Sequence, residues 1–234
     1  MTHASAATGR PLVVFDFDHT LYDGDSGAHL VAWLVKRHAW RRALALLAAP
    51  LLLPMVAWLP TRRHGISGFL WIGTAGDPRP IEGLVDAYVA ADAPAIRARL
   101  LAPALAMLHR HRVAGDLVVV ATGAPPELAR AILDFVAHQD LPVVGSLGRR
   151  HLGGYVTDQH CHAENKMRML RARGFGVVDI AYSDSSADLP LLRAARAPVV
   201  VNPKAGSVGL FRRVLPAGTP ILNWGCKSRA GEVP

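Results

Sequence analysis

The sequence contains little cysteine and few aromatic residues. Only Cys161 and Cys226 occur among its 234 residues, and aromatic side chains make up 6%. Two cysteines are too few for a scaffold built on disulfides, and no zinc-type ligand spacing accompanies them. His160 and His162 flank Cys161, but side chains so close along one segment seldom converge on a single ion. Two reduced thiols are typical of a cytoplasmic protein.

The first residues also lack the apolar segment of a secretory signal. The stretch from Met1 to Pro11 is small and polar, so we expect a loose leader before the first strand. No internal repeat and no nucleic-acid-binding module is recognisable.

Acidic residues are scarce relative to basic ones. Lysine and arginine total 26 against 18 acidic residues, which gives a formal net charge of +8. This excess predicts an anionic partner: a phosphorylated metabolite, an anionic lipid or a nucleic acid. The arginines are scattered and are not interleaved with stacking aromatic residues, which disfavours nucleic acid.

Short apolar runs alternate with helical patterns along most of the chain. The runs predict strands at residues 11–15, 116–120, 142–144, 177–182 and 198–201. The helical stretches lie near residues 125–139, 163–173 and 187–196. This alternation predicts an α/β fold with a parallel sheet and right-handed crossovers. Glycines between Val144 and Glu164 indicate a β-hairpin.

The segment from Gly24 to about Ala102 contains no convincing strand and is predicted to be helical. It follows the first strand directly and interrupts the alternation. We therefore expect an insertion that forms a lid over the carboxyl edge of the sheet, where ligands bind in open α/β folds.

Polar side chains follow the predicted strands. They are Asp16 and Asp18, then Thr122 and Gly123, then Asp184 and Asp188, with Lys166 early in an intervening helix. If the strands are parallel, these side chains meet at one edge. Clustered carboxylates stay ionised only when a cation neutralises them, and oxygen donors without histidine or cysteine favour Mg²⁺.

The same residues provide the groups that phosphoryl transfer needs. An aspartate carboxylate can attack phosphorus and form an acyl phosphate, which water then hydrolyses. A second carboxyl group, two positions along an extended backbone, can protonate the leaving oxygen and later activate the water. Lys166, the Thr122 hydroxyl and loop amides can hold the phosphate oxygens.

Each motif alone also has an ordinary structural explanation. A D-x-D-x-T sequence is common in loops and at helix starts, Lys166 can be a solvated helix residue, and Asp184 and Asp188 can cap a helix. The order of the motifs, each at a strand end, favours a phosphate site.

This constellation resembles the haloacid dehalogenase (HAD) superfamily in its phosphoserine-phosphatase-like branch, subfamily IB. The resemblance implies a Rossmann-like catalytic core over residues 1–23 and 103–234, with a helical cap at residues 24–102. It implies Asp16 as nucleophile and Asp18 as general acid and base. The further roles that it implies are phosphate binding by Thr122, Gly123 and Lys166, and a Mg²⁺ site formed by Asp16, Asp18 (through its main-chain carbonyl) and Asp184. Asp188 is expected to orient Lys166 or a metal-bound water.

Two positions depart from the pattern of that superfamily. His19 and Ser183 stand where glycine is usual. His19 would then need a backbone conformation that its β-carbon tolerates, or it contributes to the site. Neither departure removes a side chain that the chemistry requires.

A narrower similarity is to the bacterial phosphatidylglycerophosphatase C group. It rests on the segments 21–25, 69–73, 161–164 and 182–186 and on the apolar cap helices. It implies an anionic lipid phosphomonoester as the substrate and a cytoplasmic protein that contacts the cytoplasmic face of the inner membrane.

The segment from Ala43 to Leu59 carries no charge in 17 residues. As one helix it would be about 26 Å long, slightly short of a bilayer core of about 30 Å. We predict that Pro50 and Pro54 kink it into an apolar hairpin in the membrane interface, because basic residues flank both ends: Lys36, Arg37, His38, Arg41 and Arg42 before it, and Arg62, Arg63 and His64 after it. The alternatives are the core of the cap or a dimer contact.

Three other functions are compatible with parts of the pattern. A soluble phosphatase of the phosphoserine phosphatase type would use the same site for a small metabolite. A phosphoacceptor receiver also clusters aspartates with threonine and lysine, but its phosphorylated aspartate follows a middle strand and no lid is inserted. A silent binding protein would have no need of Asp16, Asp18, Lys166 and Asp184 together.

Overall fold

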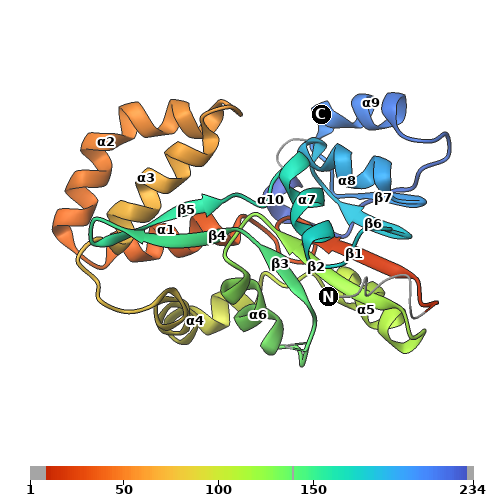
Figure 1. Cartoon of the computed structure of the whole chain (residues 1–234), viewed down its shortest axis with the longest axis horizontal. Helices are drawn as coiled ribbons and strands as arrows, with labels where there is room; N and C mark the ends of the chain where they lie inside the picture. Colours follow the sequence, from red (N-terminus) through yellow and green to blue (C-terminus); the bar gives the residue numbers. More distant parts are fainter. Residues whose placement is uncertain (1–8, 139, 231–234) are drawn as a thin grey trace.

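The computed structural model of the chain describes residues 9–138 and 140–230. The predicted leader, residues 1–11, lies largely outside the described residues. Figure 1 shows a sheet flanked by helices at one end of the molecule and a group of helices with a hairpin at the other.

The sheet has six parallel strands in the order β3-β2-β1-β6-β7-β8. Their bounds are β1 Leu12–Asp16, β2 Leu117–Thr122, β3 Val143–Gly145, β6 Ile180–Ser183, β7 Ala197–Val201 and β8 Ile221–Leu222. The strand order proceeds in opposite directions from β1, so the carboxyl end of β1 lies at the switch point of the sheet. The α/β fold predicted from the sequence is confirmed.

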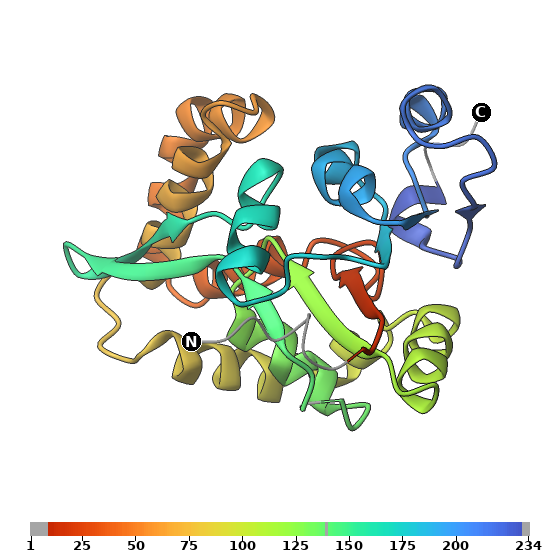
Figure 2. The same ribbon diagram turned by 45° about the vertical axis from the view of Figure 1, so that its right-hand side comes forward.

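Alternate residues of the strands form two separate cores. Val13 and Phe15 contribute to one core, together with apolar residues of α5 (Ala102–Val113) and α6 (Pro126–Asp134). Leu12 and Val14 point to the other, which includes residues of α7 (Glu164–Ala172), α8 (Leu189–Ala194) and α9 (Ala205–Val214). Figure 2 shows these helices on opposite sides of the sheet, so the strands are buried on both faces.

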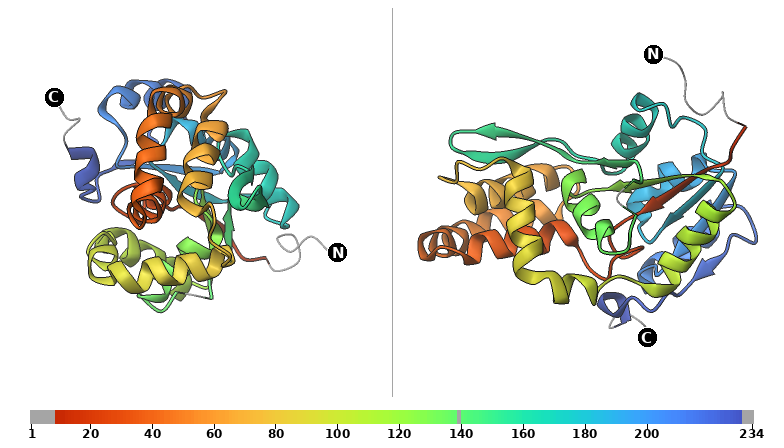
Figure 3. Two further views of the ribbon diagram at one scale, coloured as in Figure 1. Left: turned by 90° about the vertical axis from the view of Figure 1, so that its left-hand side faces the viewer. Right: turned by 90° about the horizontal axis from the view of Figure 1, so that it is seen from below.

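Four helices follow β1 and lie between it and α5. They are α1 Ser26–Lys36, α2 Ala39–Ala57, α3 Arg62–Thr74 and α4 Ile81–Arg97. Asp25 caps α1 by accepting a hydrogen bond from the Ala28 amide at 2.8 Å. Leu84 and Tyr88 of α4 pack into the first core, while α2 and α3 extend away from the sheet (Figure 3).

The hairpin predicted between Val144 and Glu164 consists of β4 (Leu147–His151) and β5 (Gly154–Gln159). It is attached to α3 by the Trp71 indole, which donates to the His151 carbonyl at 3.1 Å, and by the Tyr155 amide, which donates to Thr74 at 2.8 Å. A β-carbon at Gly154 would lie 2.8 Å from Cδ1 of Trp71. Glycine therefore permits the hairpin to lie against the inserted helices.

Several predicted boundaries were wrong. The strand expected from residue 177 begins at Ile180, because Asp179 instead accepts the Leu12 amide at 2.7 Å. The helix expected over 125–139 ends at Asp134. The sequence analysis did not predict α9, β8 or the short α10 (Lys227–Ala230).

The hairpin predicted within residues 43–59 does not form within that segment. Helix α2 is continuous through Pro50 and Pro54, and the turn lies after it, between Trp58 and Thr61. The hairpin is formed by α2 and α3 together. Gly65 allows their close approach, since a β-carbon there would lie 2.8 Å from the Val56 amide nitrogen.

Most of α2 faces outward, and its single buried residue is Arg41. The Arg41 guanidinium donates to the carbonyls of Leu34 and Ala75, so it is a structural residue and not a cation at the surface, as the sequence had suggested. Leu46 and Leu47 are 75% and 80% exposed. The apolar residues of α2 therefore do not form the core of the inserted unit. Among the described helices, α2 alone has the length and composition of a membrane-crossing helix.

The end of β3 provides a test of backbone packing. A β-carbon at Gly145 would lie 2.8 Å from the Ala124 carbonyl oxygen and from the Pro126 nitrogen, both main-chain atoms that cannot rotate away. We expect Gly145→Ala to lower the free energy of unfolding in urea by about 1–3 kcal/mol. Gly148→Ala, where the nearest atom is 3.6 Å away, is the control and should have a much smaller effect. Equal losses would contradict this account.

Candidate active site

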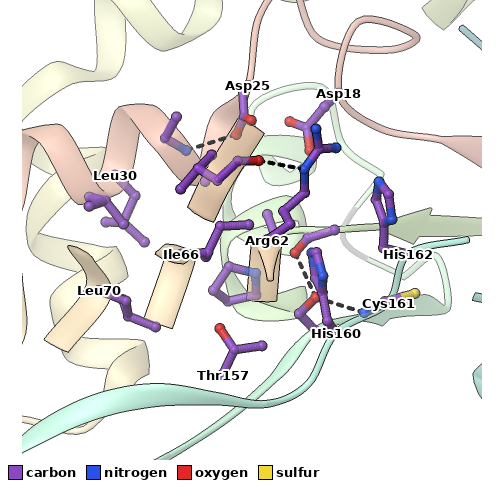
Figure 4. Close-up of a pocket in the computed structure, with 18 of the residues that line it drawn as sticks. Asp18, Asp25, Leu30, Arg62, Ile66, Leu70, Thr157, His160, Cys161 and His162 are labelled. Carbon is purple, nitrogen blue, oxygen red and sulfur yellow. Dashed lines mark hydrogen bonds between the residues drawn. The ribbon is translucent and has the colours of Figure 1, made fainter. Parts of the chain in front are cut away.

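A pocket of about 1170 Å³ lies between the carboxyl edge of the sheet, the inserted helices and the hairpin. Its floor is polar and includes Asp16, Asp18, Lys166 and Asp184, whereas apolar residues of α1 to α3 form much of the remaining wall. Figure 4 shows Asp18 and Arg62 on one side of the pocket and Leu30, Ile66 and Leu70 on another. The polar floor and the apolar wall therefore belong to one continuous pocket.

Lys166 lies between two carboxylates at the centre of the floor. Its ammonium nitrogen is 2.7 Å from Oδ1 of Asp16 and 2.6 Å from Oδ2 of Asp188. All three side chains are buried. Burial lowers the pKa of Lys166, but the two carboxylates outweigh it and raise that pKa above its usual range. Lys166 is therefore positively charged and fixed in place.

Ser183 secures the second carboxylate. Its hydroxyl donates to Oδ2 of Asp188 at 2.7 Å, and it is fully buried at the end of β6. The serine that replaces the expected glycine therefore adds a hydrogen bond that orients Asp188 toward Lys166.

Asp18 lies two residues beyond Asp16 and has different partners. Its Oδ1 accepts from the Ser26 amide at the start of α1 (2.7 Å), and its Oδ2 accepts from Thr122 (3.3 Å). The start of the inserted helices therefore holds this carboxyl group in place. The hydrogen bond from Thr122, at the end of β2, fixes the second carboxylate oxygen of Asp18.

The environments of Asp16 and Asp18 separate their proton affinities. Burial raises the pKa of Asp16 to about 6, although Lys166 opposes this. Burial, with repulsion from Asp25, raises the pKa of Asp18 to about 8. At neutral pH Asp18 retains a proton while Asp16 is largely ionised, which is the division that an acid and a nucleophile require.

Asp184 lies at the end of the neighbouring strand and forms an ion pair with Arg229 of α10. Burial and the charge of Asp16 raise the pKa of Asp184, and Arg229 opposes the rise. Asp23 anchors this C-terminal segment, because its carboxylate accepts from the amides of Lys227 (3.1 Å) and Ser228 (2.9 Å). Burial raises the pKa of Asp23, but these hydrogen bonds outweigh it and lower that pKa to about 2.

The donor set of the floor is suited to Mg²⁺. Asp16, Asp18 and Asp184 line one pocket and offer only oxygen. Burial raises the pKa values of Asp16 and Asp184, and a divalent cation beside their carboxylates would lower them. In the described part of the chain, no group of three or more histidine, cysteine, aspartate or glutamate side chains is placed to hold a metal ion. Mg²⁺ commonly uses one or two carboxylates, waters and substrate phosphate, so a complete cage is not required.

The predicted phosphate ligands lie at different positions relative to the pocket. Gly123 lines it, and Lys166 is on its floor. Thr122 is fully buried; its hydroxyl donates to Asp18 and accepts from the Ala124 amide at 3.0 Å. In this structure Thr122 orients Asp18, and its role in binding phosphate stays a prediction.

His19 adopts the left-handed conformation that its position was expected to demand, with φ of 59°. Asn202 supports it by donating to the His19 carbonyl at 2.8 Å, and the His19 ring contacts the Ser228 hydroxyl at 3.0 Å. The histidine thus links the first loop to the C-terminal segment.

The sequence analysis missed several residues of the site. Asp25 could have been recognised as a helix cap before Ser26-Gly27. Arg229 carried no signal, because its contact with Asp184 depends on how the C-terminal segment crosses the sheet. Arg62, His160 and His162 also line the pocket, and nothing in their local sequence indicated that they would meet.

The model of the family of haloacid dehalogenase-like hydrolases matches residues 13–193, most of the chain. A sequence search of curated proteins finds no match.

Solved structures with similar folds include proteins of known and unknown function. A crystal structure of a protein of unknown function from Bordetella pertussis Tohama I is 21% identical, with 92% of this chain and 99% of that chain covered and a TM-score of 0.72. A phosphoserine phosphatase with an analogue of its phospho-aspartyl intermediate is 13% identical (92% and 93% covered, TM-score 0.55). Cytosolic 5′-nucleotidase IIIB bound to cytidine is 14% identical (92% and 80% covered, TM-score 0.61). At these identities the likeness concerns the fold.

Removal of Lys166 should leave two buried carboxylates without their cation. We expect Lys166→Met to lower the free energy of unfolding by about 3–5 kcal/mol at pH 8 in cation-free buffer. Without Lys166 the folded-state pKa of Asp16 rises further above its unfolded value, so the folded protein takes up a proton as the pH falls. The loss should therefore be smaller at pH 5, as urea unfolding at both pH values would reveal.

Arg168→Met is the matched control, because Arg168 is exposed on the same helix. It should change stability little at either pH. A loss for Lys166→Met that is the same at pH 5 and pH 8 would contradict the charge-based explanation.

Proposed function

This chain belongs to the haloacid dehalogenase-like hydrolases, and we propose that it is a phosphomonoester hydrolase that forms an aspartyl-phosphate on Asp16. The observation that carries the proposal is the position of Asp16, which Lys166 contacts at 2.7 Å, beside Asp18 two residues away, whose pKa burial raises above that of Asp16.

The proposed reaction has two steps. A carboxylate oxygen of Asp16 attacks phosphorus while the bond to the ester oxygen breaks, and Asp18 donates its proton to that leaving oxygen. Asp18, now ionised, then takes a proton from water as the water attacks the aspartyl-phosphate. This step releases inorganic phosphate and restores both carboxyl groups.

The remaining residues of the floor bind and orient the phosphoryl group. Lys166 and the main chain near Gly123 hold its equatorial oxygens, and Asp188 keeps Lys166 in position. We assign Asp16, the main-chain carbonyl of Asp18, and Asp184 to a Mg²⁺ ion. When bound, this ion would neutralise negative charge on the phosphoryl group.

We propose phosphatidylglycerophosphate, or a closely related anionic lipid, as the substrate, as in the phosphatidylglycerophosphatase C group. The apolar wall that continues from the catalytic floor supports this choice, since it includes Leu30, Val31, Val35, Leu53, Val56, Ile66, Phe69 and Leu70. A small polar metabolite would leave this surface unused. A soluble phosphatase of the phosphoserine phosphatase type is the runner-up.

The outer surface of α2 supports contact with a membrane. Leu46, Leu47 and Leu51 are 68% to 80% exposed, and Trp40 and Trp58 are about half exposed or more at its two ends. Lys36, Arg37 and Arg42 are exposed near one end, and Arg63 near the other. An apolar strip between aromatic and basic residues is typical of a helix in the interface of an anionic leaflet. We therefore propose that the protein is cytoplasmic and binds peripherally to the cytoplasmic face of the inner membrane.

The nucleophile is tested by phosphate release from phosphatidylglycerophosphate and from phosphoserine, with and without Mg²⁺. We expect turnover of the lipid and a loss of roughly 10³-fold or more in kcat for Asp16→Asn, because the amide cannot form the intermediate. Asp18→Asn should lose about 10²- to 10⁴-fold.

Asp86→Asn, an exposed position on α4, should retain full activity. Turnover of phosphoserine alone would favour the runner-up substrate class. Full activity of Asp16→Asn would exclude the proposed nucleophile.

Membrane contact is tested by co-sedimentation with phosphatidylglycerol vesicles at low salt. Replacement of Leu46, Leu47 and Leu51 by serine should reduce the bound fraction at least about tenfold, since each leucine buried in the interface contributes about 1.5–3 kcal/mol. The matched control replaces Val113 and Val177, which are exposed on the surface outside the inserted helices. This variant should bind as the wild type does. An absence of binding by the wild type would refute this part of the proposal.

A further inference from the structure

Three basic side chains line the pocket above the catalytic floor without serving the reaction described so far. Arg62 belongs to α3, whereas His160 and His162 lie between β5 and α7. Figure 4 shows Arg62 extending toward Asp18, with His160 and His162 on the adjoining wall. The two imidazole rings are stacked, with centroids 5.1 Å apart and planes 8° from parallel. The group therefore combines one residue of the inserted helices with two residues of the core.

Arg62 directs most of its donors to the pocket. Its Nε donates to the Val56 carbonyl at 2.9 Å, which fixes the direction of the side chain. In the described part of the chain, no carboxylate lies within ion-pair distance of its guanidinium. By contrast, neighbouring Arg63 is exposed and donates to the Asp158 carbonyl. The two terminal nitrogens of Arg62 are thus available to a ligand.

The histidines have a comparable arrangement. Within residues 140–230 their hydrogen bonds use the main-chain atoms of the histidines. His162 N and Asn165 Nδ2 donate to the His160 carbonyl, and Asn165 N donates to the His162 carbonyl. The Nε2 atom of His160 lies 3.8 Å from where a β-carbon of Gly123 would be, so this ring borders the loop assigned to the phosphoryl group. Lys166 differs from these three residues, because its positive charge is already paired with two carboxylates of the protein, Asp16 and Asp188.

Arg62 supplies the positive charge of this group, because the two imidazoles beside it are disfavoured from taking up protons. Burial, with smaller contributions from His162 and Arg62, lowers the pKa of His160 to about 4. Burial also lowers the pKa of His162. Neutral imidazoles can still donate one N–H each, and arginine binds phosphate oxygens in a bidentate manner.

We propose that Arg62, His160 and His162 form a second anion subsite that binds a phosphodiester group of the same substrate molecule. This inference rests on the proposed phosphatase activity and defines its substrate class: a phosphomonoester that carries a phosphodiester nearby. The floor residues act on the monoester, while the subsite holds the diester and so selects such molecules over simple monoesters.

The subsite is tested by comparing kcat/KM for three substrates. These are phosphatidylglycerophosphate, its deacylated form glycerophosphoglycerophosphate, and p-nitrophenyl phosphate, which has no second anionic group. We expect Arg62→Gln to lower kcat/KM about 10- to 100-fold for the first two substrates and less than about threefold for the third. His160→Asn should show the same selectivity. Arg171→Gln, which removes an equal charge at an exposed position on α7, should leave all three values unchanged.

Two results would overturn the proposal. An equal loss with all three substrates would mean that Arg62 acts on the reacting phosphoryl group or on folding. A loss confined to the acylated lipid would assign Arg62 to contact with the acyl chains or the membrane surface. Preserved p-nitrophenyl phosphate hydrolysis and an unchanged melting temperature show that the variants are folded.

A binding measurement separates failure of the subsite from failure of the phosphatase assignment. Glycerophosphoglycerol contains the phosphodiester but neither a monoester nor acyl chains, and its binding to the wild type and variants can be followed by calorimetry. If the wild type hydrolyses none of the three substrates, the proposed function fails. The subsite then stands if Arg62→Gln weakens glycerophosphoglycerol binding about tenfold or more relative to Arg171→Gln, and falls if the two variants bind alike.

Discussion

The buried contact of Lys166 with Asp16 and Asp188 is the interaction on which the site depends. It joins the end of β1 and the turn that precedes α8 to the first turn of α7 through distances of 2.7 and 2.6 Å. Two buried carboxylates this close to one another would repel, and a lysine in the same place without them would lose its charge. The three residues are therefore stable only as a set. Ser183 completes the set by fixing Asp188, and the parallel strands bring its members to one edge of the sheet.

The inserted helices turn this edge into an enclosed chamber and change its chemistry. The Ser26 amide at the start of α1 holds Asp18, and the enclosure raises the pKa of Asp18 to about 8. The hairpin, attached through Trp71, closes the opposite side. The inserted helices also supply the apolar wall of the pocket. The same helices therefore keep the proton on Asp18 that the proposed reaction needs and provide the surface that would accept an apolar substrate. The C-terminal segment adds a third boundary, since Asp23 and His19 hold it where Arg229 pairs with Asp184.

The basic residues of the pocket differ in whether a carboxylate of the protein pairs with them. Lys166 is neutralised by protein carboxylates and serves as a fixed part of the floor. Arg229 neutralises Asp184. Arg62 and the two histidines line the cavity, and they come from both the inserted helices and the core. A ligand that bridges them would therefore contact both parts of the protein at once.

The sequence by itself determined the fold class and the set of residues available for chemistry. Apolar runs that end in Asp16, Thr122 and Asp184 predicted a parallel sheet with polar groups at one edge, and the fold is confirmed. These features are local, because strand burial and helix periodicity are properties of neighbouring residues. Only the tertiary structure decided that Arg41 is buried, that α2 presents its leucines outward, and that Arg229 and Arg62 reach the pocket. Those outcomes depend on how elements distant in the sequence pack, and no local pattern encodes which face of a helix will meet a partner.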